Sequence, residues 1–476
     1  MKRYLFFVAL ATLLACGTLQ AKITLPSVIG DNMVLQQQTD AALWGKAEPG
    51  RKVTVKTSWD KKTVRTTADP QTGQWLVRVA TPAAGGPYEI TISDGEKITL
   101  KNILVGEVWF ASGQSNMEMP VMGFPGQPAE GGAEAIVSAR RDRPIRVCNV
   151  QKQSTVEVME DVPCKWEENT PGAVAATSAA AWFFADAVQT ALGVPVGIIH
   201  SSWGGSNIET WIPYEVLKEQ FPEVDLGSVE GTHPVKSANH DGCLLFNGMV
   251  APLLPYTIKG ILWYQGEANR GAPAQYIRLQ TAYVQAMRER FQVPDAPFYF
   301  VQIAPWPYGG PQSFDSGYFF EAQQKSLETI PHSGMAVTCD IGDYGTIHPS
   351  KKREVGQRLA WLALEHDYGF DAIKADAPTY AGVTFQDGKA VVTFNVDNLC
   401  LAPIGTPLEG FEIAGEDRVF HKADAMIDGG NYKRVVVSCA EVPAPVAVRY
   451  CFRNWCKGSL YNNYGIPAAP FRTDNW

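Results

Sequence analysis

The sequence predicts an α/β protein: a parallel sheet with helices on both faces, flanked by an N-terminal and a C-terminal all-β domain. Apolar runs alternate with amphipathic helical stretches from about residue 103 to residue 370, which is typical of a parallel sheet covered on both faces. On both sides of this region, apolar and polar residues alternate with a period of two, as in half-buried antiparallel strands. The 476 residues are too many for one core and predict roughly three domains.

Residues 1–21 are typical of an export signal. Lys2 and Arg3 precede an apolar run from Leu5 to Ala15, and small and polar residues follow up to Ala21. This run is too short to span a bilayer. We expect cleavage after Ala21 and an exported protein, periplasmic or secreted. The "LLAC" stretch ending at Cys16 leaves lipoprotein anchoring as the less favoured alternative.

Three segments follow the leader. Residues 22–102 carry the alternating stretches "KVTVKTSW", "WLVRVATP", "YEITISDG" and "KITLKNI", separated by Gly and Pro turns, and predict a β-sandwich-like domain. Residues 103–370 contain the apolar runs of the parallel sheet: Ile103–Ala111, Val196–Ser201, Ile258–Tyr264, Phe298–Ile303 and Met335–Asp340. In the helical stretch "SKKREVGQRLAWLALEHDYG", Val355, Leu359 and Leu362 share one face and the charges lie on others. Residues 371–476 return to alternation and predict a second β domain.

Charge and cysteine usage exclude several classes of function. The net formal charge is −8 and no Lys/Arg-rich run occurs, so we expect no binding of nucleic acid or anionic membrane. Neither a CxxC pair nor an HExxH motif occurs, so the sequence predicts no metal site. Export permits disulfides, and the pairs nearest in sequence are Cys451 with Cys456 and Cys148 with Cys164.

Polar residues follow the predicted parallel strands, where ligands bind in such sheets. The first strand is followed by Ser115 and the second by the pair Gly204-Gly205; Gln265 follows the third, and His348 comes after the last. A serine, a glycine pair, a carboxamide and a histidine are the groups that acyl transfer requires. Asn116, Trp203 and Glu267 lie on the same strand ends and are expected to bind substrate.

Each group has a chemical role and a plainer alternative. A serine hydroxyl needs a base to attack a carbonyl, and histidine suits that role because its pKa lies near neutral pH. His200 also ends a strand and is the alternative to His348 as the base. Its place within the strand pattern, however, favours an orienting or packing role. Alone, Ser115 would more often cap a helix. Glu209 and Glu267 are alternative acid–base residues. Aromatic side chains beside the strands either form a sugar-stacking wall or belong to the core: Trp203, Trp211, Trp263, Tyr264 and Trp306.

Together these segments resemble the SGNH hydrolases, and more closely the sialate O-acetylesterase family of carbohydrate esterases. The resembling stretches cover nearly all of the chain after the leader: "ITLPSVIGDNMVLQQ", "VWFASGQSNMEMPV", "IIHSSWGGSNIETWIP", "LFNGMVAPLLPYTIKGILWYQGEAN", "DIGDYGTIHPSKKREVGQRLAW" and "GIPAAPFRTDNW". The resemblance implies an SGNH-hydrolase-like sheet, Ser115 as nucleophile and His348 as general base. It implies an oxyanion hole made by the N–H groups of Ser115 and Gly205 and by the Gln265 amide.

One departure from the family pattern concerns the partner of the histidine. Family members carry an aspartate two residues before it, and here that position is Thr346. Asp343 is the nearest carboxylate and is expected to orient His348 if the loop folds back. Otherwise a backbone carbonyl or Thr346 holds the ring, and the site is a Ser-His dyad.

The resemblance implies an exported serine esterase that removes O-acetyl groups from sugars without a cofactor, with O-acetylated sialic acid as the first expected substrate. One alternative is an esterase for acetylated xylan or another glycan. Another, raised by Thr346, is a carbohydrate-binding protein that keeps the fold with weakened catalysis. The sequence predicts no particular oligomeric state.

Overall fold

A computed structural model describes residues 23–310, 312–397 and 399–476. The predicted leader, with Cys16, therefore lies outside the described residues. Within these ranges, every helix is too short or too polar to cross a membrane.

The centre of the molecule is a mostly parallel sheet. Neighbouring strands are parallel except β9, which is antiparallel to β8. The predicted α/β class and its parallel sheet are therefore confirmed. The strand order is β13 (Ser333–Ala336), β12 (Phe298–Val301), β11 (Gly260–Tyr264), β7 (Lys97–Gly113), β10 (Val196–Ser202), β8 (Ile145–Asn149) and β9 (Trp166–Glu168).

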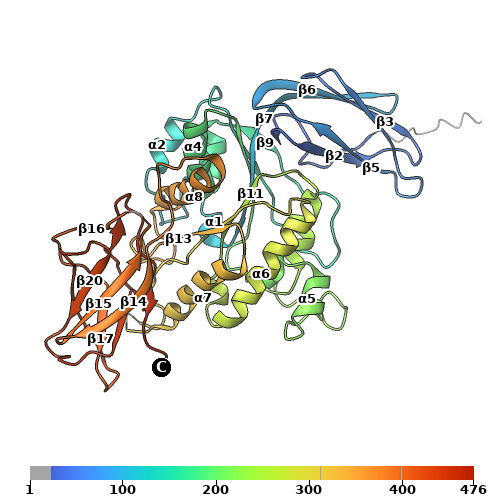
Figure 1. Cartoon of the computed structure of the whole chain (residues 1–476). Helices are drawn as coiled ribbons and strands as arrows, with labels where there is room; N and C mark the ends of the chain where they lie inside the picture. Colours follow the sequence, from blue (N-terminus) through green and yellow to red (C-terminus); the bar gives the residue numbers. More distant parts are fainter. Residues whose placement is uncertain (1–22, 311, 398) are drawn as a thin grey trace, which may run out of the picture.

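Helices cover both faces of this sheet (Figure 1). The side chains of one face pack with α4 (Ala179–Leu192) and α8 (Lys352–Tyr368), near the short helices α2 (Gly132–Val137) and α3 (Pro171–Ala176). The other face is covered by α6 (Pro273–Arg290) and α7 (Asp315–Thr329), with α5 (Tyr214–Gln220) beside them. One turn of helix, α1 (Ser115–Glu118), follows β7.

Helix α8 shows both the strength and the limit of periodicity. Val355, Leu359 and Leu362 are buried, as the pattern predicts. The expectation that all charges of this helix face elsewhere is wrong, because Lys352 is fully buried and Arg358 is 6% exposed. Arg358 is paired with Asp340 at the end of the sheet. Lys352 lies at the start of the helix, beside the candidate site.

The N-terminal strands continue directly into the central sheet through β7. The first part of β7 is antiparallel to β6, and its last residues pair with β10 and β11. The predicted boundary between residues 102 and 103 falls inside this single strand, and the domain boundaries stay predictions. The N-terminal strands are β1 (Val34–Gln36), β2 (Asp40–Lys46), β3 (Lys52–Thr57), β4 (Thr63–Thr67), β5 (Gln74–Ala80) and β6 (Gly85–Ser93).

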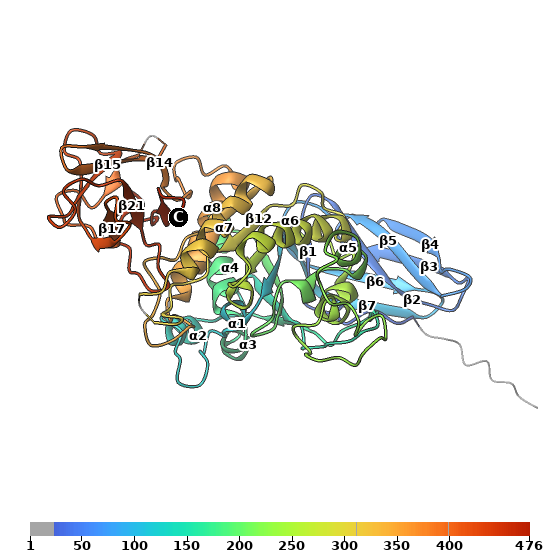
Figure 2. The same cartoon turned by 90° about the horizontal axis from the view of Figure 1, so that it is seen from below.

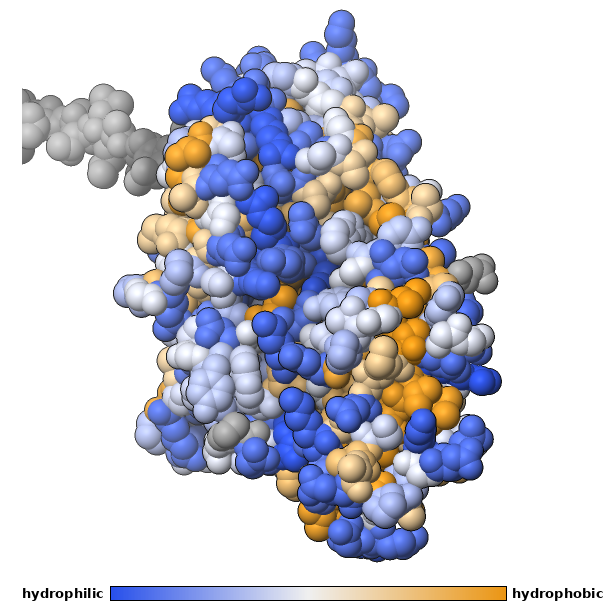
Figure 3. Space-filling model, turned by 90° about the vertical axis from the view of Figure 1, so that its left-hand side faces the viewer, coloured by the Kyte–Doolittle hydropathy of each residue, from blue (hydrophilic) through white to orange (hydrophobic). Residues whose placement is uncertain are grey.

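The C-terminal residues form antiparallel sheets in the orders β14-β15-β20-β19 and β18-β17-β21-β23, with the pair β16-β22. They lie at the opposite end of the molecule from β2–β6 (Figures 1 and 2). The face on their side is mostly hydrophilic, with apolar residues gathered toward one edge (Figure 3). The strands are β14 (Thr379–Gln386), β15 (Lys389–Asn395), β16 (Leu401–Ala402), β17 (Phe411–Ala414), β18 (Phe420–Lys422), β19 (Asp424–Ile427), β20 (Arg434–Ser438), β21 (Ala447–Tyr450), β22 (Tyr461–Asn462) and β23 (Phe471–Arg472).

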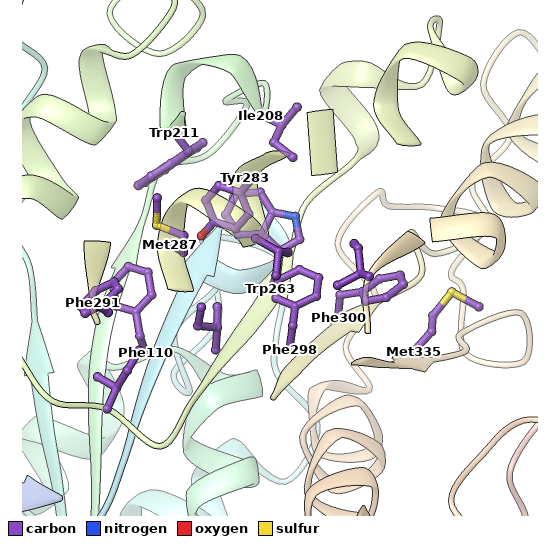
Figure 4. Packing of buried hydrophobic residues seen from close by; sticks show 14 of the residues in the cluster. Phe110, Ile208, Trp211, Trp263, Tyr283, Met287, Phe291, Phe298, Phe300 and Met335 are labelled. Carbon is purple, nitrogen blue, oxygen red and sulfur yellow. The ribbon is translucent and has the colours of Figure 1, made fainter. Parts of the chain in front are cut away.

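Aromatic side chains fill the core between the sheet and α6. Trp211 and Trp263 meet edge to face, and Trp263 packs against Tyr283 of α6 (Figure 4). Trp211, Trp263 and Tyr264 are fully buried, so for these three the core alternative is confirmed and the sugar-stacking wall is excluded. Of the five residues of that wall, only Trp203 and Trp306 remain half-buried.

Of the two predicted disulfides, the structure contains one. Cys451 and Cys456 are bonded. Cys148 and Cys164 are free thiols and lie close together: burial, and then the neighbouring Cys164, raise the pKa of Cys148.

Candidate active site

Ser115 lies at the carboxyl end of the central strand β7. Gly113, the last residue of the strand, has a φ of +141°, and a Cβ there would lie 2.1 Å from the carbonyl oxygen of Tyr264 in β11. Only glycine fits this close approach between neighbouring strands. The chain turns there, and Ser115 becomes the first residue of α1. Its side chain is half-buried, and neither its N–H nor its Oγ has a hydrogen-bond partner among the described residues.

His348 lies in the loop between β13 and α8. Its Nδ1 is 2.6 Å from Oε1 of Gln127, and because a carboxamide oxygen only accepts, Nδ1 carries the proton. Nε2 is thus the basic nitrogen, and it is free of partners within the described part of the chain. Burial and then the charge of Lys352 lower the pKa of His348, while Glu118 raises it. The two lowering effects favour the neutral imidazole, which is the form that accepts a proton.

The predicted partner of His348 is contradicted by the structure. Asp343 is exposed and accepts the N–H of Gly345 at 2.8 Å, while Gln127 occupies the orienting position at Nδ1. Thr346 supports this arrangement, because its Oγ1 accepts the His348 N–H at 3.1 Å and lies 3.3 Å from Oε1 of Gln127. Sequence reasoning missed Gln127, which is 221 positions away from His348 and belongs to no predicted strand end.

The segments that carry Ser115 and His348 lie side by side. Nδ2 of Asn116 donates to the carbonyl oxygen of Ile347 at 3.1 Å, so the neighbours of nucleophile and base are bonded to each other. Ser115 Oγ and His348 Nε2 make no direct hydrogen bond. Catalytic hydrogen bonds are often long without substrate and tighten when it binds.

Two of the three predicted oxyanion donors remain available. Gly205 is exposed with a φ of +74°, and its N–H has no acceptor in the described ranges. The preceding Gly204 lies against the nucleophile, since a Cβ there would be 3.3 Å from Cβ of Ser115. The N–H of Gly204 donates to Glu118, which fixes this loop. The N–H groups of Ser115 and Gly205 stay predicted donors.

The third predicted donor is contradicted. Gln265 is fully buried, and its Nε2 donates to Ser206 O at 3.1 Å and to Asn269 Oδ1 at 2.8 Å. Asn269 is itself fixed, because its Nδ2 donates to Glu209. The same bond gives Glu209, the alternative acid–base residue, a structural partner. Gln265 therefore braces the loops after β10 and β11 and offers no free N–H to a ligand.

The three predicted substrate-binding residues differ in their access to a ligand. Asn116 is fully buried and bonded on both sides of its amide, so direct contact with substrate is contradicted. Glu267 accepts from Asn116 at 2.6 Å, its other oxygen is buried with no partner among the residues that the structure describes, and burial raises its pKa. Trp203 is half-buried, with the Lys152 ammonium 5.4 Å from its ring centroid. Only Trp203 is still placed to meet a ligand.

His200, the alternative base, has both ring nitrogens engaged. Nδ1 bonds to Oδ1 of Asn149 at 3.0 Å and Nε2 to Oγ of Ser202 at 2.6 Å. Burial and then the charge of Lys152 lower its pKa to about 4. His200 is a buried structural residue, consistent with the orienting or packing role that its place in the strand predicts.

One group of side chains within the described residues has the spacing of metal ligands: Glu365, His366 and Asp376. It lies near the carboxyl end of α8, whereas His348 precedes the amino end of that helix. Glu365 also binds Lys374 and the N–H of Ala375. This cluster is separate from the site around Ser115.

Comparisons with known proteins identify the family to which this chain is similar. A family model described as "Carbohydrate esterase, sialic acid-specific acetylesterase" matches residues 105–365, which include Ser115, Gly205 and His348. The sialate O-acetylesterase of Mus musculus is 26% identical over 94% of this chain and 93% of its own. That of Homo sapiens is 30% identical over 74% and 72%, respectively.

A solved structure shares the whole architecture. The crystal structure of a carbohydrate acetylesterase from Xanthomonas citri has a TM-score of 0.84 and 35% identity, covering 96% of this chain and 100% of that one. A shared fold at this identity, together with the family match over more than half of the sequence, establishes both the fold family and the class of reaction, that of a carboxylic ester hydrolase. The chain belongs to the sialic acid-specific acetylesterase family of carbohydrate esterases.

Proposed function

We propose that this carbohydrate esterase removes O-acetyl groups from sialic acid through an acetyl-serine intermediate. The observation that carries the proposal is the family match over residues 105–365, because it spans the nucleophile, the glycine loop and the histidine at once. The similarity to the mouse sialate O-acetylesterase over nearly the full length of both chains supports the choice of substrate.

In the acylation step, Ser115 Oγ attacks the acetyl carbonyl carbon while Nε2 of His348 accepts the hydroxyl proton. The carbonyl oxygen becomes an oxyanion, which accepts hydrogen bonds from the N–H groups of Ser115 and Gly205. Removing one such donor typically costs about 3 kcal/mol of transition-state stabilisation. The tetrahedral intermediate collapses, the bond from carbon to the sugar oxygen breaks, and the imidazolium returns its proton to that oxygen.

In the deacylation step, a water molecule takes the place of the sugar. Nε2 of His348 accepts a proton from the water as its oxygen attacks the acetyl-enzyme. The second intermediate releases acetate, and the proton returns to Ser115 Oγ. Gln127 keeps the proton on Nδ1 throughout, so that Nε2 is the nitrogen that exchanges protons in both steps.

The substrate is tested by acetate release from O-acetylated sialic acid and from acetylated xylan, with Ser115→Ala as the control. We expect faster release from sialic acid and loss of both activities in the variant. Faster release from acetylated xylan would leave the assignment as an esterase intact but would contradict sialic acid as the substrate. A serine-directed fluorophosphonate probe should label the wild type and not Ser115→Ala. Tight sugar binding without labelling would favour the binding protein.

We also propose export through the leader at residues 1–21, on the pattern of Lys2, Arg3 and the apolar run that follows. Expression in a Gram-negative host followed by fractionation and N-terminal sequencing tests this. A periplasmic or secreted product that begins at Lys22 is expected. Retention in the cytoplasm with Met1 intact would contradict export, and a lipidated product that begins at Cys16 would instead indicate anchoring.

A further inference from the structure

A buried polar network lies directly behind Ser115 and is not used by the proposed mechanism. Its centre is the ammonium group of Lys352, a side chain with no exposed surface. Nζ of Lys352 donates to Oδ1 of Asn116 and to the carbonyl oxygen of Pro349, each at 2.7 Å. Asn116 extends the network, because its Nδ2 donates to Glu267 at 2.6 Å and to the carbonyl oxygen of Ile347 at 3.1 Å.

The network binds the chain on both sides of His348. Ile347 precedes the histidine and Pro349 follows it, and the carbonyl oxygens of both accept hydrogen bonds from this network. Asn116 is the residue after Ser115. One buried assembly thus fixes the loop of the base relative to the turn of the nucleophile.

Lys352 also carries a charge into this region. Three titratable groups from neighbouring segments interact with it: Glu267 after β11, Tyr264 in β11 with its ring centroid 5.8 Å from Nζ, and His348 in the loop. Glu118 of α1 acts on the same histidine with the opposite sign. Burial lowers the pKa of Lys352 to about 7, and Glu267 opposes that shift. The ammonium form therefore prevails below neutral pH, and its charge opposes protonation of the imidazole.

We propose that Lys352 is a positioning residue of the esterase: it fixes the His348 loop through Pro349 and Asn116, and it places a buried ammonium group beside that loop. This inference rests on the proposed roles of Ser115 and His348. The combination is unusual in energetic terms, because a buried ammonium is costly unless it is paired and hydrogen-bonded. Two carbonyl-type acceptors and a nearby carboxylate meet that requirement here.

The test is the pH profile of Lys352→Met, with Lys351→Met as the matched control at an exposed neighbouring lysine. Using 4-nitrophenyl acetate, we expect kcat of Lys352→Met to fall about tenfold or more while KM changes less than about threefold. The acid limb of kcat/KM should move upward by about half a pH unit or more, since the limb reports the free enzyme's base. Lys351→Met should match the wild type, and Lys352→Arg, which keeps the cation, should keep the wild-type limb.

A merely structural role predicts a different result. A uniform loss of activity with an unmoved acid limb, or an unchanged Lys352→Met enzyme, would overturn the inference. If Lys352→Met does not fold, Lys352→Gln retains an N–H donor, and the same upward shift is required of it. Ser115→Ala separates the two proposals: if that variant stays active, the proposed mechanism fails, whereas its inactivity with an unmoved limb in the Lys352 variants rejects this inference alone.

Discussion

Two histidines of this molecule have nearly the same hydrogen-bonding pattern and very different surroundings. Each donates from Nδ1 to a side-chain amide oxygen, His348 to Gln127 at 2.6 Å and His200 to Asn149 at 3.0 Å. In His200 the second nitrogen is occupied by Ser202 and the ring is buried. In His348 the second nitrogen has no partner among the described residues, and the ring is half-buried.

This difference teaches what separates a base from a structural histidine. Asn149, His200 and Ser202 form a chain of contacts with the distances of a catalytic triad. Ser202 is only 5% exposed, so its hydroxyl is closed off from a substrate. In the region of His348, the half-buried Ser115 has a hydroxyl and the exposed Gly205 an N–H that lack partners among the described residues. Access and uncommitted atoms, rather than the hydrogen-bond chain, distinguish the two regions.

Replacing the two histidines is the strongest way to break this comparison. His348→Ala should lower kcat about a thousandfold or more, because the base is lost while oxyanion stabilisation remains. His200→Gln should retain kcat within about fivefold and instead lower the melting temperature, since buried hydrogen bonds contribute about 1 kcal/mol each. Acetate release and thermal melts followed by circular dichroism measure both. Equal loss of activity in a folded His200→Gln enzyme would contradict the distinction.

Gln127 provides the next largest effect. Gln127→Ala removes the acceptor at Nδ1, and we expect kcat to fall about tenfold to a hundredfold, since an orienting partner can matter by orders of magnitude. Gln127→Glu places a carboxylate there, which should raise the pKa of His348 and move the acid limb of kcat/KM upward. The exposed Gln151→Ala is the control. Wild-type profiles in both Gln127 variants would show that the contact does not orient the base.

The fold was predictable because its signals are local. The apolar runs of the parallel strands and the spacing of Val355, Leu359 and Leu362 each lie within one segment, and their alternation with helices predicts that the strands are parallel. The short motif around Ser115 and the His348 segment were found in the same way. Their neighbourhood depends on the topology, which the alternation also predicts.

The misassigned residues share a different cause. Asn116 and Gln265 lie at strand ends, as ligand-binding residues do, yet their side chains turn into the protein and bond to buried partners. Position along the chain gives the strand end but not the direction of the side chain. The partner of His348 comes from a loop that has no periodic pattern, and proximity in sequence favoured Asp343 instead. The charges of the α8 stretch, Lys352 among them, were expected on faces other than the apolar one, because charged side chains are rarely buried.

The structural role of His200 can be tested through the stability of the protein at acid pH. The pKa of His200 falls from 6.5 to about 4 in the folded protein. Between these values the unfolded chain binds a proton that the folded one refuses, so stability falls as the pH drops through this window. The contribution is on the order of 3 kcal/mol at most, at 1.36 kcal/mol per pKa unit. Urea unfolding from pH 7 to pH 4.5 should show a smaller loss of stability in His200→Gln; an equal loss would assign the acid sensitivity to other groups.

The smallest expected effect comes from the ion pair that links the two regions. Lys152 and Glu118 are 2.7 Å apart and partly exposed. Lys152 lowers the pKa of His200, whereas Glu118 raises that of His348. Lys152→Met removes the cation paired with Glu118, so the acid limb of kcat/KM should move upward by less than about half a pH unit. Stability should change by less than about 1 kcal/mol, as for other exposed pairs.

The salt dependence of this shift in the acid limb shows whether Glu118 acts on His348 through solvent or through the protein interior. At about 1 M salt the screening length is near 3 Å, so a field that reaches His348 through solvent should vanish there. The exposed Lys165→Met is the control for a general change of net charge. A shift that survives high salt would mean that Glu118 acts through the protein interior, by way of its hydrogen bond to the Gly204 N–H. A downward shift would contradict the assigned sign, because an unpaired carboxylate near an imidazole favours its protonated form.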